Sequence, residues 1–111
     1  MSNLELLHKS IPEIASMYRS KQLSPLELTR LTLERIEQLN PSLNAFITVT
    51  SEKALTQAAR AEQQLASGID LGLLHGIPIA LKDLVDTAGI RTTCGSSILR
   101  DHVPENDAAI T

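Results

Sequence analysis

The sequence predicts an α/β fold in which helices pack on a mixed central sheet. Apolar residues three and four positions apart mark residues 24–40 and 51–67 as amphipathic helices. Two apolar runs, at 44–49 and 77–83, lie next to turn-forming residues and are typical of strands. Helices that alternate with strands in this way favour a layered α/β arrangement over a helical bundle.

The first helices are predicted from their start signals. Ser10–Glu13 has the Ser-x-x-Glu form of a capping box and predicts a short helix that runs to about Ser20. Ser24–Glu27 repeats the box, with Pro25 at the first helical position, and predicts a longer helix. That helix is expected to end at Asn40, because a proline follows and disfavours helical backbone in the residue before it.

The rest of the chain is predicted as strand, helix, connector and strand. The run 44–49 is expected to be a strand, and the helix over 51–67 stops at a glycine that tolerates the left-handed conformation. The run 77–83 is continuously apolar at first, which is typical of a strand buried on both faces. It ends in Lys82 and Asp83, at the carboxyl end of the strand, where ligand sites of α/β sheets lie.

Composition and charge argue against several classes of function. The 111 residues have a net charge of -3, and the 10 Lys and Arg are intermixed with 13 Asp and Glu, so nucleic acid finds no basic stripe. Tyr18 and Phe46 are the only aromatic residues, which leaves almost nothing for base stacking. No stretch has the apolar length of a membrane span or the core of a secretory signal. We therefore expect a cytoplasmic protein that contacts neither nucleic acid directly nor a membrane.

The cysteine, histidine and glycine patterns do not indicate a cofactor or a metal. Cys94 is the single cysteine and cannot form an internal disulfide, in agreement with a reducing compartment. His8, His75 and His102 lack the spacing of metal ligands, and we expect them to be surface or loop residues. The glycines fit neither a GxGxxG nor a P-loop pattern. We expect no cofactor and no metal.

Three motifs toward the carboxyl end resemble the amino-terminal conserved block of the amidase signature family. They are GIPIALKD at 76–83, GIRTTCGS at 89–96, and Pro104 followed by Asp-Ala-Ala at 107–109. The resemblance implies the amino-terminal part of the amidase signature fold, with residues 1–111 as the amino-terminal segment of a single amidase domain. We expect that domain to be incomplete at its carboxyl end, because Asp107 has the form of an N-cap that opens a helix.

The resemblance assigns the catalytic lysine of the family to Lys82. In that family a serine, a second serine in a cis peptide and a lysine hydrolyse amides through an acyl-enzyme, and Lys82 matches the general base. A protonated lysine cannot accept a proton, so we expect burial behind Ile77, Ile79 and Leu81 to favour its neutral form. Without the resemblance, Lys82 has the pattern of a surface lysine that keeps its charge in water.

Four residues after Lys82 are predicted to support the site or to line its cavity: Asp83, Thr93, Gly95 and Ser96. Successive strand side chains point to opposite faces, so Asp83 is expected to tie the following loop to backbone N–H groups rather than to neighbour the ammonium. A plain turn is the alternative reading for 92–96. The sequence Cys-Gly-Ser-Ser at 94–97 looks like a nucleophile turn, but the family's two catalytic serines lie far downstream of it.

We expect the chain to be part of an amidase, a hydrolase that converts a small-molecule carboxamide to a carboxylate and ammonia or an amine. A stand-alone amidase is preferred, because Leu74-His75 and Leu84-Val85 look more like stand-alone members. The alternatives are the glutaminase subunit of a tRNA-dependent amidotransferase and a non-catalytic remnant or interaction piece. The serines and the oxyanion donors would lie in the missing carboxyl-terminal part of the domain, so the segment is expected to be inactive alone.

Overall fold

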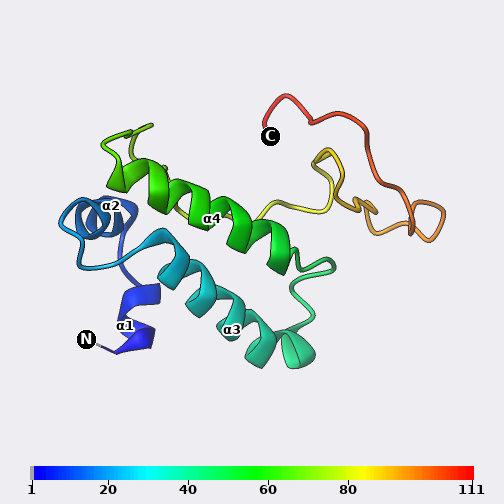
Figure 1. Ribbon diagram of the computed structural model, residues 1–111. Coiled ribbons are helices and arrows are strands. Elements are labelled where there is room, and N and C mark those ends of the chain that lie inside the picture. The colour runs from blue at the N-terminus through cyan, green and yellow to red at the C-terminus, as the bar shows by residue number, and fades with distance from the viewer. Residues whose placement is uncertain (1) are drawn as a thin grey trace. The chain divides into compact units, whose positions relative to one another are not determined.

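The computed structural model describes residues 2–111 and divides into two compact units. The first, here called the helical unit, comprises the chain up to Phe46 together with Ser51–Pro78. The second, here called the loop unit, comprises Ile47–Thr50 and Ile79–Thr111. Over the described residues every helix lies in the helical unit, in the order α1 (Asn3–Leu7), α2 (Ile11–Arg19), α3 (Pro25–Leu43) and α4 (Ser51–Ala66) (Figure 1). No helix in residues 2–111 combines the length and the apolar character needed to cross a membrane.

The starts of α2 and α3 confirm the helix signals in the sequence. Before α3 the Glu27 carboxylate accepts the Ser24 N–H at 2.9 Å, and the Ser24 hydroxyl accepts the Glu27 N–H at 3.1 Å. Before α2 the Glu13 carboxylate accepts both the N–H and the hydroxyl of Ser10, at 2.8 and 2.7 Å. Both helices thus begin where side chains satisfy backbone donors that the first turn leaves free.

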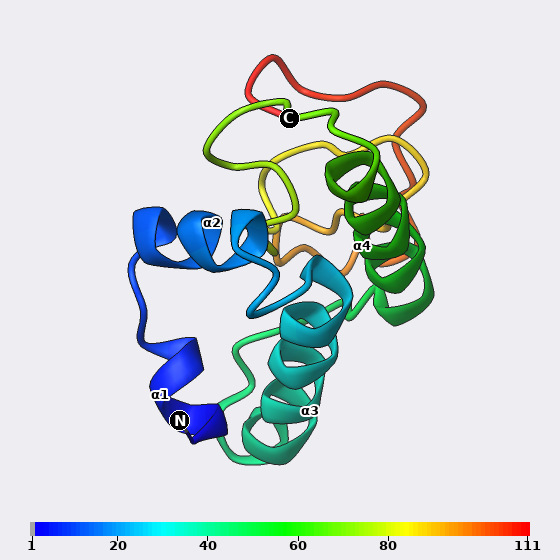
Figure 2. The ribbon, with the colours of Figure 1, turned by 60° about the vertical axis from the view of Figure 1, so that its left-hand side comes forward.

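Sequence analysis missed α1, although the same start signal precedes it. The Glu5 carboxylate accepts the Ser2 N–H at 2.6 Å, and the Ser2 hydroxyl accepts the Glu5 N–H at 3.2 Å. The helix is five residues long and has no buried residue. Figure 2 shows it beside α3, and the two helices contact each other. Helix α1 is too short to show a periodic pattern of apolar residues. The capping box of Ser2 and Glu5 is the one signal in the sequence that could have predicted it.

The expected end of α3 at Asn40 is wrong, because the helix continues through Pro41 to Leu43. The Asn40 side chain explains this difference. Its amide donates to the Phe46 carbonyl at 3.0 Å and accepts the Phe46 N–H at 2.8 Å, which closes the chain over the last turn. Pro41 lies within that last turn, so the helix loses only the one backbone hydrogen bond that the missing N–H of proline would have donated. Asn44, in the left-handed conformation, ends the helix.

The end of α4 agrees with the sequence. Gly68 has φ +86°, and its N–H donates to the Leu65 carbonyl at 3.2 Å. The N–H of Ile69 donates to the Gln64 carbonyl at 2.8 Å. This pair of bonds is the Schellman arrangement, which needs a residue with positive φ just past the helix, and glycine adopts it without strain.

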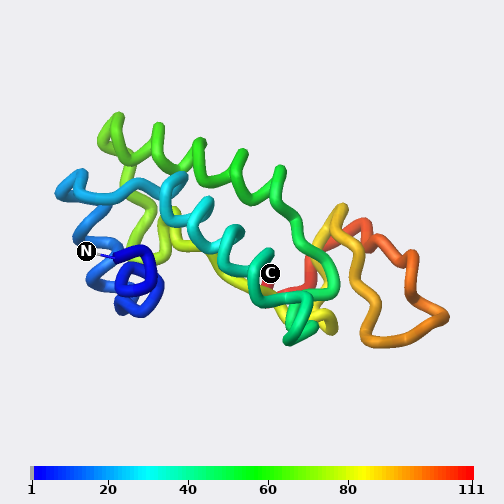
Figure 3. Tube along the Cα trace, turned by 90° about the horizontal axis from the view of Figure 1, so that it is seen from below, coloured from blue at the N-terminus to red at the C-terminus, as the bar shows by residue number. Residues whose placement is uncertain are grey.

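The helical unit has a small apolar core to which distant parts of the chain contribute. Helix α4 lies along α3 in both Figure 1 and Figure 3, and the small residues Ala58 and Ala61 are buried on α4. Ile77 packs against the buried cluster of this core. It belongs to the GIPIALKD motif at 76–83, here called the lysine motif. The first residues of that motif are therefore fixed by helices that precede it by about fifty residues in the chain. The buried cluster consists of Ile14, Tyr18, Leu23 and Leu28.

The expected strands at 44–49 and 77–83 are not present in the described residues, and neither is a mixed sheet. Both runs are irregular, and the described chain contains an isolated antiparallel bridge between Thr87 and Ile90. A strand requires a neighbour whose backbone groups pair with its own. Neither run pairs with such a neighbour within residues 2–111. Their β-branched and apolar composition is therefore not enough to form a ladder of backbone hydrogen bonds between strands.

Gly76, the first residue of the lysine motif, lies against two side chains of the helical unit. Its carbonyl accepts the Tyr18 hydroxyl at 3.0 Å, and burial raises the pKa of Tyr18, which keeps this hydroxyl a donor. Gly76 has φ +80°, and a Cβ there would lie 2.7 Å from Pro25 Cγ and 3.3 Å from Tyr18 Cε2. Only a residue without a side chain permits this approach.

We predict that Gly76→Ala destabilises the chain more than Gly68→Ala does. Both positions have nearly the same positive φ, but a Cβ at Gly68 has no atom within 4 Å, whereas one at Gly76 meets the rigid Pro25 ring. Backbone strain is thus common to both variants, and steric overlap adds about 1–3 kcal/mol at Gly76 alone. Urea unfolding monitored by circular dichroism measures the difference. Equal losses of stability in the two variants would contradict the close packing of Gly76.

Candidate functional site

The loop unit is held together by backbone bonds between two stretches of irregular chain. The N–H of Gly89 donates to the Pro104 carbonyl at 3.0 Å, and the N–H of Thr92 donates to the His102 carbonyl at 2.9 Å. Thr92 and Pro104 are both buried. The second family motif, at 89–96, is therefore pinned by the chain around Pro104, where the third motif begins.

Asp83 organises the part of the loop unit that follows Lys82. Its carboxylate accepts the Thr93 N–H at 2.8 Å and also the Thr93 hydroxyl. Its backbone carbonyl accepts the Cys94 N–H at 2.8 Å. The Thr93 hydroxyl in turn accepts the Gly95 N–H at 3.2 Å. Side chain and backbone of one aspartate thus close a loop of ten residues onto the buried Thr93, which is 4% exposed.

These bonds also set the charge state of Asp83. Hydrogen bonds from the Thr93 hydroxyl, and next from the Thr93 N–H, hold the pKa of the Asp83 carboxyl below its usual range, with smaller contributions from the Gly95 N–H and the Arg91 cation. A carboxylate stabilised in this way stays ionised at neutral pH. Asp83 is consequently a fixed anion and a hydrogen-bond acceptor, which suits a structural clamp and not a proton donor.

Lys82 is exposed, which differs from the burial that we expected. Its ammonium has no hydrogen bond or ion pair with any of residues 2–111, and its carbonyl accepts the Val85 N–H at 2.9 Å. Ile79 and Leu81, which were expected to cover it, are 72% and 44% exposed. Ile77, the third expected cover residue, packs on the apolar core instead. The physical reason is the missing sheet: without a layer on either face, residues 79–82 are exposed to water.

The other candidate residues are brought together around Thr93. The Ser96 N–H donates to the Thr93 carbonyl at 2.9 Å, and the Ser96 hydroxyl accepts the Ile98 N–H at 3.2 Å. The backbone and the hydroxyl of Ser96 therefore both form hydrogen bonds within the local turn, as is typical of serine in loops. Cys94 is exposed, has φ +52°, and forms no disulfide. The site roles of Thr93, Gly95 and Ser96 remain predictions.

Asp107 does not open a helix in the described chain. Its carboxylate accepts the Ala88 N–H at 2.7 Å, and residues 108–111 form a turn in which the Thr111 N–H donates to the Ala108 carbonyl. The Asp86 carbonyl accepts both the Ala108 N–H and the Thr111 hydroxyl at 2.8 Å. The N-cap pattern of the sequence thus serves to fasten 86–88 to the end of the chain. In residues 2–111 no group of three His, Cys, Asp or Glu side chains gathers in a way that could hold a metal ion.

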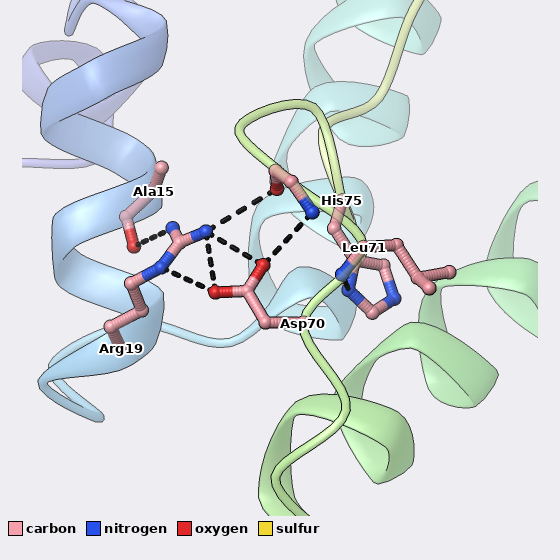
Figure 4. A network of polar contacts seen from close by, with 6 residues as sticks. Ala15, Arg19, Asp70, Leu71 and His75 are labelled. Atoms are coloured by element: carbon pink, nitrogen blue, oxygen red, sulfur yellow. Dashed lines mark hydrogen bonds and ion pairs between the residues drawn. The ribbon is translucent and has the colours of Figure 1, made fainter.

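The connector that leads into the lysine motif is fastened to α2 by an ion pair that sequence analysis missed. The Arg19 guanidinium donates to both carboxylate oxygens of Asp70 at 2.8 Å (Figure 4). It also donates to the Ala15 carbonyl at 2.9 Å and to the Gly72 carbonyl at 3.3 Å. The two charged residues are 51 positions apart, so no local pattern could have paired them.

We predict that Asp83→Ala loosens the loop closed on Thr93. The substitution leaves the Thr93 N–H without its partner, and exchange of this amide with solvent should become roughly tenfold faster. Asp101→Ala is the matched control, because Asp101 lies in the same unit and its carboxylate has no hydrogen bond or ion pair within residues 2–111. Amide hydrogen exchange followed by NMR compares the two variants with the unmodified chain.

The same clamp has a defined pH dependence. The pKa of Asp83 is lowered in the folded chain, so its contribution to stability is present above the ordinary pKa of aspartate, about 3.9, and is lost as the pH falls through the lower folded value. Protection of the Thr93 amide should therefore fall in acid for the unmodified chain. Unchanged protection of this amide in acid, or in Asp83→Ala, would show that Asp83 does not hold the loop.

Comparison with known proteins agrees with these motifs. The amidase family model matches residues 27–111. Three relatives are each named as the A subunit of glutamyl-tRNA(Gln) amidotransferase. The protein from a Cyanothece species is 49% identical over 92% of this chain, and that from Methylobacillus flagellatus is 48% identical over 95%. The protein from Acaryochloris marina is 42% identical over all of the chain.

The match is confined to part of these relatives. The chain covers 21% of the length of the Cyanothece and Methylobacillus proteins and 22% of the Acaryochloris protein, so it spans about a fifth of the relatives. The family match covers the lysine motif, the loop that Asp83 closes onto Thr93, all of α4 and nearly all of α3. The chain therefore belongs to the amidase signature family.

Proposed function

We propose that the protein takes part in amide cleavage as the A subunit of a glutamyl-tRNA(Gln) amidotransferase. One observation carries the proposal: relatives with this name are 49% and 41% identical to this chain over 92% and 96% of its length. The preference for a stand-alone amidase, which rested on two dipeptides beside the lysine motif, is not confirmed, and these relatives lean against it. The substrate would be the side-chain amide of glutamine, cleaved to glutamate and ammonia.

In this proposal Lys82 is the general base of a serine, cis-serine and lysine triad. Lys82 accepts, through the bridging serine, the proton of the nucleophilic serine as its oxygen bonds to the amide carbon. The C–N bond then breaks, and the proton returns to the leaving nitrogen, which departs as ammonia. Water attacks the resulting acyl ester by the same proton route and releases the carboxylate. Both serines would come from outside residues 1–111.

The exposure of Lys82 gives this proposal a structural requirement. A lysine in water is protonated at neutral pH and cannot act as a base. We propose that residues 1–111 are one segment of a single amidase domain, and that the rest of this domain covers Ile79, Leu81 and Lys82. Desolvation would then favour the neutral amine. Asp83 and Thr93 would hold the backbone beside Lys82 in place while that layer packs on it.

We predict that Lys82→Ala lowers glutamine turnover by the enzyme that carries this segment roughly 10²–10⁴-fold, the usual contribution of a general base. Lys82→Arg should be equally impaired, because a guanidinium keeps the charge but does not give up its proton near neutral pH. Ammonia release at saturating glutamine measures turnover, and thermal unfolding shows that both variants still fold. Near-normal turnover in either variant would remove Lys82 from the mechanism.

The proposed place in an amidotransferase predicts a partner and a tRNA dependence. The protein, isolated from its source at native abundance, should co-purify with other subunits, and ammonia release should increase with glutamyl-tRNA(Gln) as acceptor. A protein that is isolated alone and hydrolyses simple carboxamides without tRNA would identify a stand-alone amidase instead. Either result leaves the role of Lys82 to be decided by its own variants.

A further inference from the structure

We infer that His75 is a pH-sensitive latch: its neutral imidazole ties the connector at 69–76 to α4, and protonation releases part of this tie. Nδ1 of His75 lies 3.2 Å from the backbone nitrogen of Leu71, and Nε2 lies 2.9 Å from Oε1 of Gln64 in α4. The imidazole is half-buried and stands beside Leu71 and Asp70 in Figure 4. The inference is independent of the proposed function.

The Leu71 contact fixes the tautomer of His75. A backbone N–H can only donate, so Nδ1 must offer a lone pair and carries no proton. In the neutral ring the proton is then on Nε2, where it can be donated to the side-chain oxygen of Gln64. One neutral form of the ring satisfies both neighbours at once. The connector is thereby joined to itself across four residues and to α4.

Protonation keeps one of these bonds and breaks the other. In the imidazolium both ring nitrogens carry protons, so Nε2 still donates to Gln64. Nδ1–H, however, then points at the N–H of Leu71, and two donors cannot share the space of one hydrogen bond. Histidine is the side chain that ordinarily changes charge between pH 5 and 8. The Leu71 bond is accordingly present at higher pH and lost as the pH falls.

The charged groups that face His75 are Asp70 and Arg19, and neither can preserve the Leu71 bond once Nδ1 carries a proton. Asp70 belongs to the same connector, and Arg19 from α2 holds it in a bidentate pair. Gln64 from α4 is uncharged. After release, the imidazolium can attract the neighbouring Asp70 carboxylate, which already accepts the Gly72 N–H at 3.0 Å. Competition for that carboxylate would loosen the connector that leads to Gly76.

His8 provides an internal control, because its geometry is the opposite. Its Nδ1 lies 2.7 Å from the Leu4 carbonyl, which can only accept, so Nδ1 of His8 carries a proton in the neutral and the charged ring alike. Lowering the pH leaves that bond intact. The two histidines of one chain should therefore show opposite neutral tautomers at high pH and differ in whether protonation disturbs the neighbouring backbone.

NMR of the 111-residue chain tests the latch. At pH 8 the imidazole nitrogen shifts should show the Nε2–H form for His75 and the Nδ1–H form for His8. Between pH 8 and pH 5 the protection factor of the Leu71 amide, corrected for intrinsic exchange, should fall roughly fivefold, the effect of losing one hydrogen bond. The titration of His75 should coincide with this fall.

His75→Asn is the decisive variant. Asparagine places an amide oxygen near the position of Nδ1 and does not titrate, so Leu71 should stay protected at both pH values. His8→Asn, the matched control, should retain the pH dependence of the unmodified chain. The latch is wrong if His75 is in the Nδ1–H form at pH 8, if Leu71 is equally protected or unprotected at both pH values, or if His75→Asn keeps the pH dependence.

Discussion

The close packing of Gly76 against Tyr18 and Pro25 is the constraint on which the start of the lysine motif, residues 76–78, depends. The Tyr18 hydroxyl holds the Gly76 carbonyl at 3.0 Å, and the missing side chain of Gly76 leaves room for the Pro25 ring. Ile77 then joins the apolar cluster of the helical unit. Helices α2 and α3 thereby fix where the motif starts, and Lys82 follows five residues after Ile77 in the chain.

The connector before Gly76 is fixed by polar contacts that also come from helices. Arg19 holds Asp70 through two bonds of 2.8 Å, and His75 links the connector to Gln64. An irregular segment can be ordered only if its backbone groups find partners outside a helix or a sheet. In this chain side chains of α2 and α4 hold the connector, which explains why it needs no regular structure of its own.

Features that depend on neighbours in the sequence could be predicted. The capping boxes at Ser10 and Ser24 and the glycine after α4 act within a few residues, so the pattern contains the whole interaction. The end of α3 could not, because the Asn40 side chain reaches across six residues to Phe46 and outweighs the effect of Pro41. Rules for helix ends consider only adjacent residues, so they do not include a side-chain contact across six residues.

In the candidate site, too, features set by nearby residues could be predicted and features set by distant residues could not. The motif residues could be found from the sequence, and Asp83 and Thr93 do lie together, ten residues apart. The expected burial of Lys82 could not be derived from its own segment, because burial depends on side chains from other parts of a fold, and residues 2–111 leave Lys82 exposed. The ion pair of Arg19 and Asp70 likewise joins residues with no shared local pattern.

The surroundings of Lys82 in the enzyme that carries this segment therefore decide whether Lys82 can act as the proposed general base. The most direct measurement is a crystal structure of that enzyme trapped by a reagent that acylates the proposed nucleophilic serine. We predict that in this structure Lys82 Nζ is buried and lies about 2.7–3.2 Å from the hydroxyl of the bridging serine. A Lys82 ammonium that remains in solvent, with no serine within reach even through one water, would contradict it.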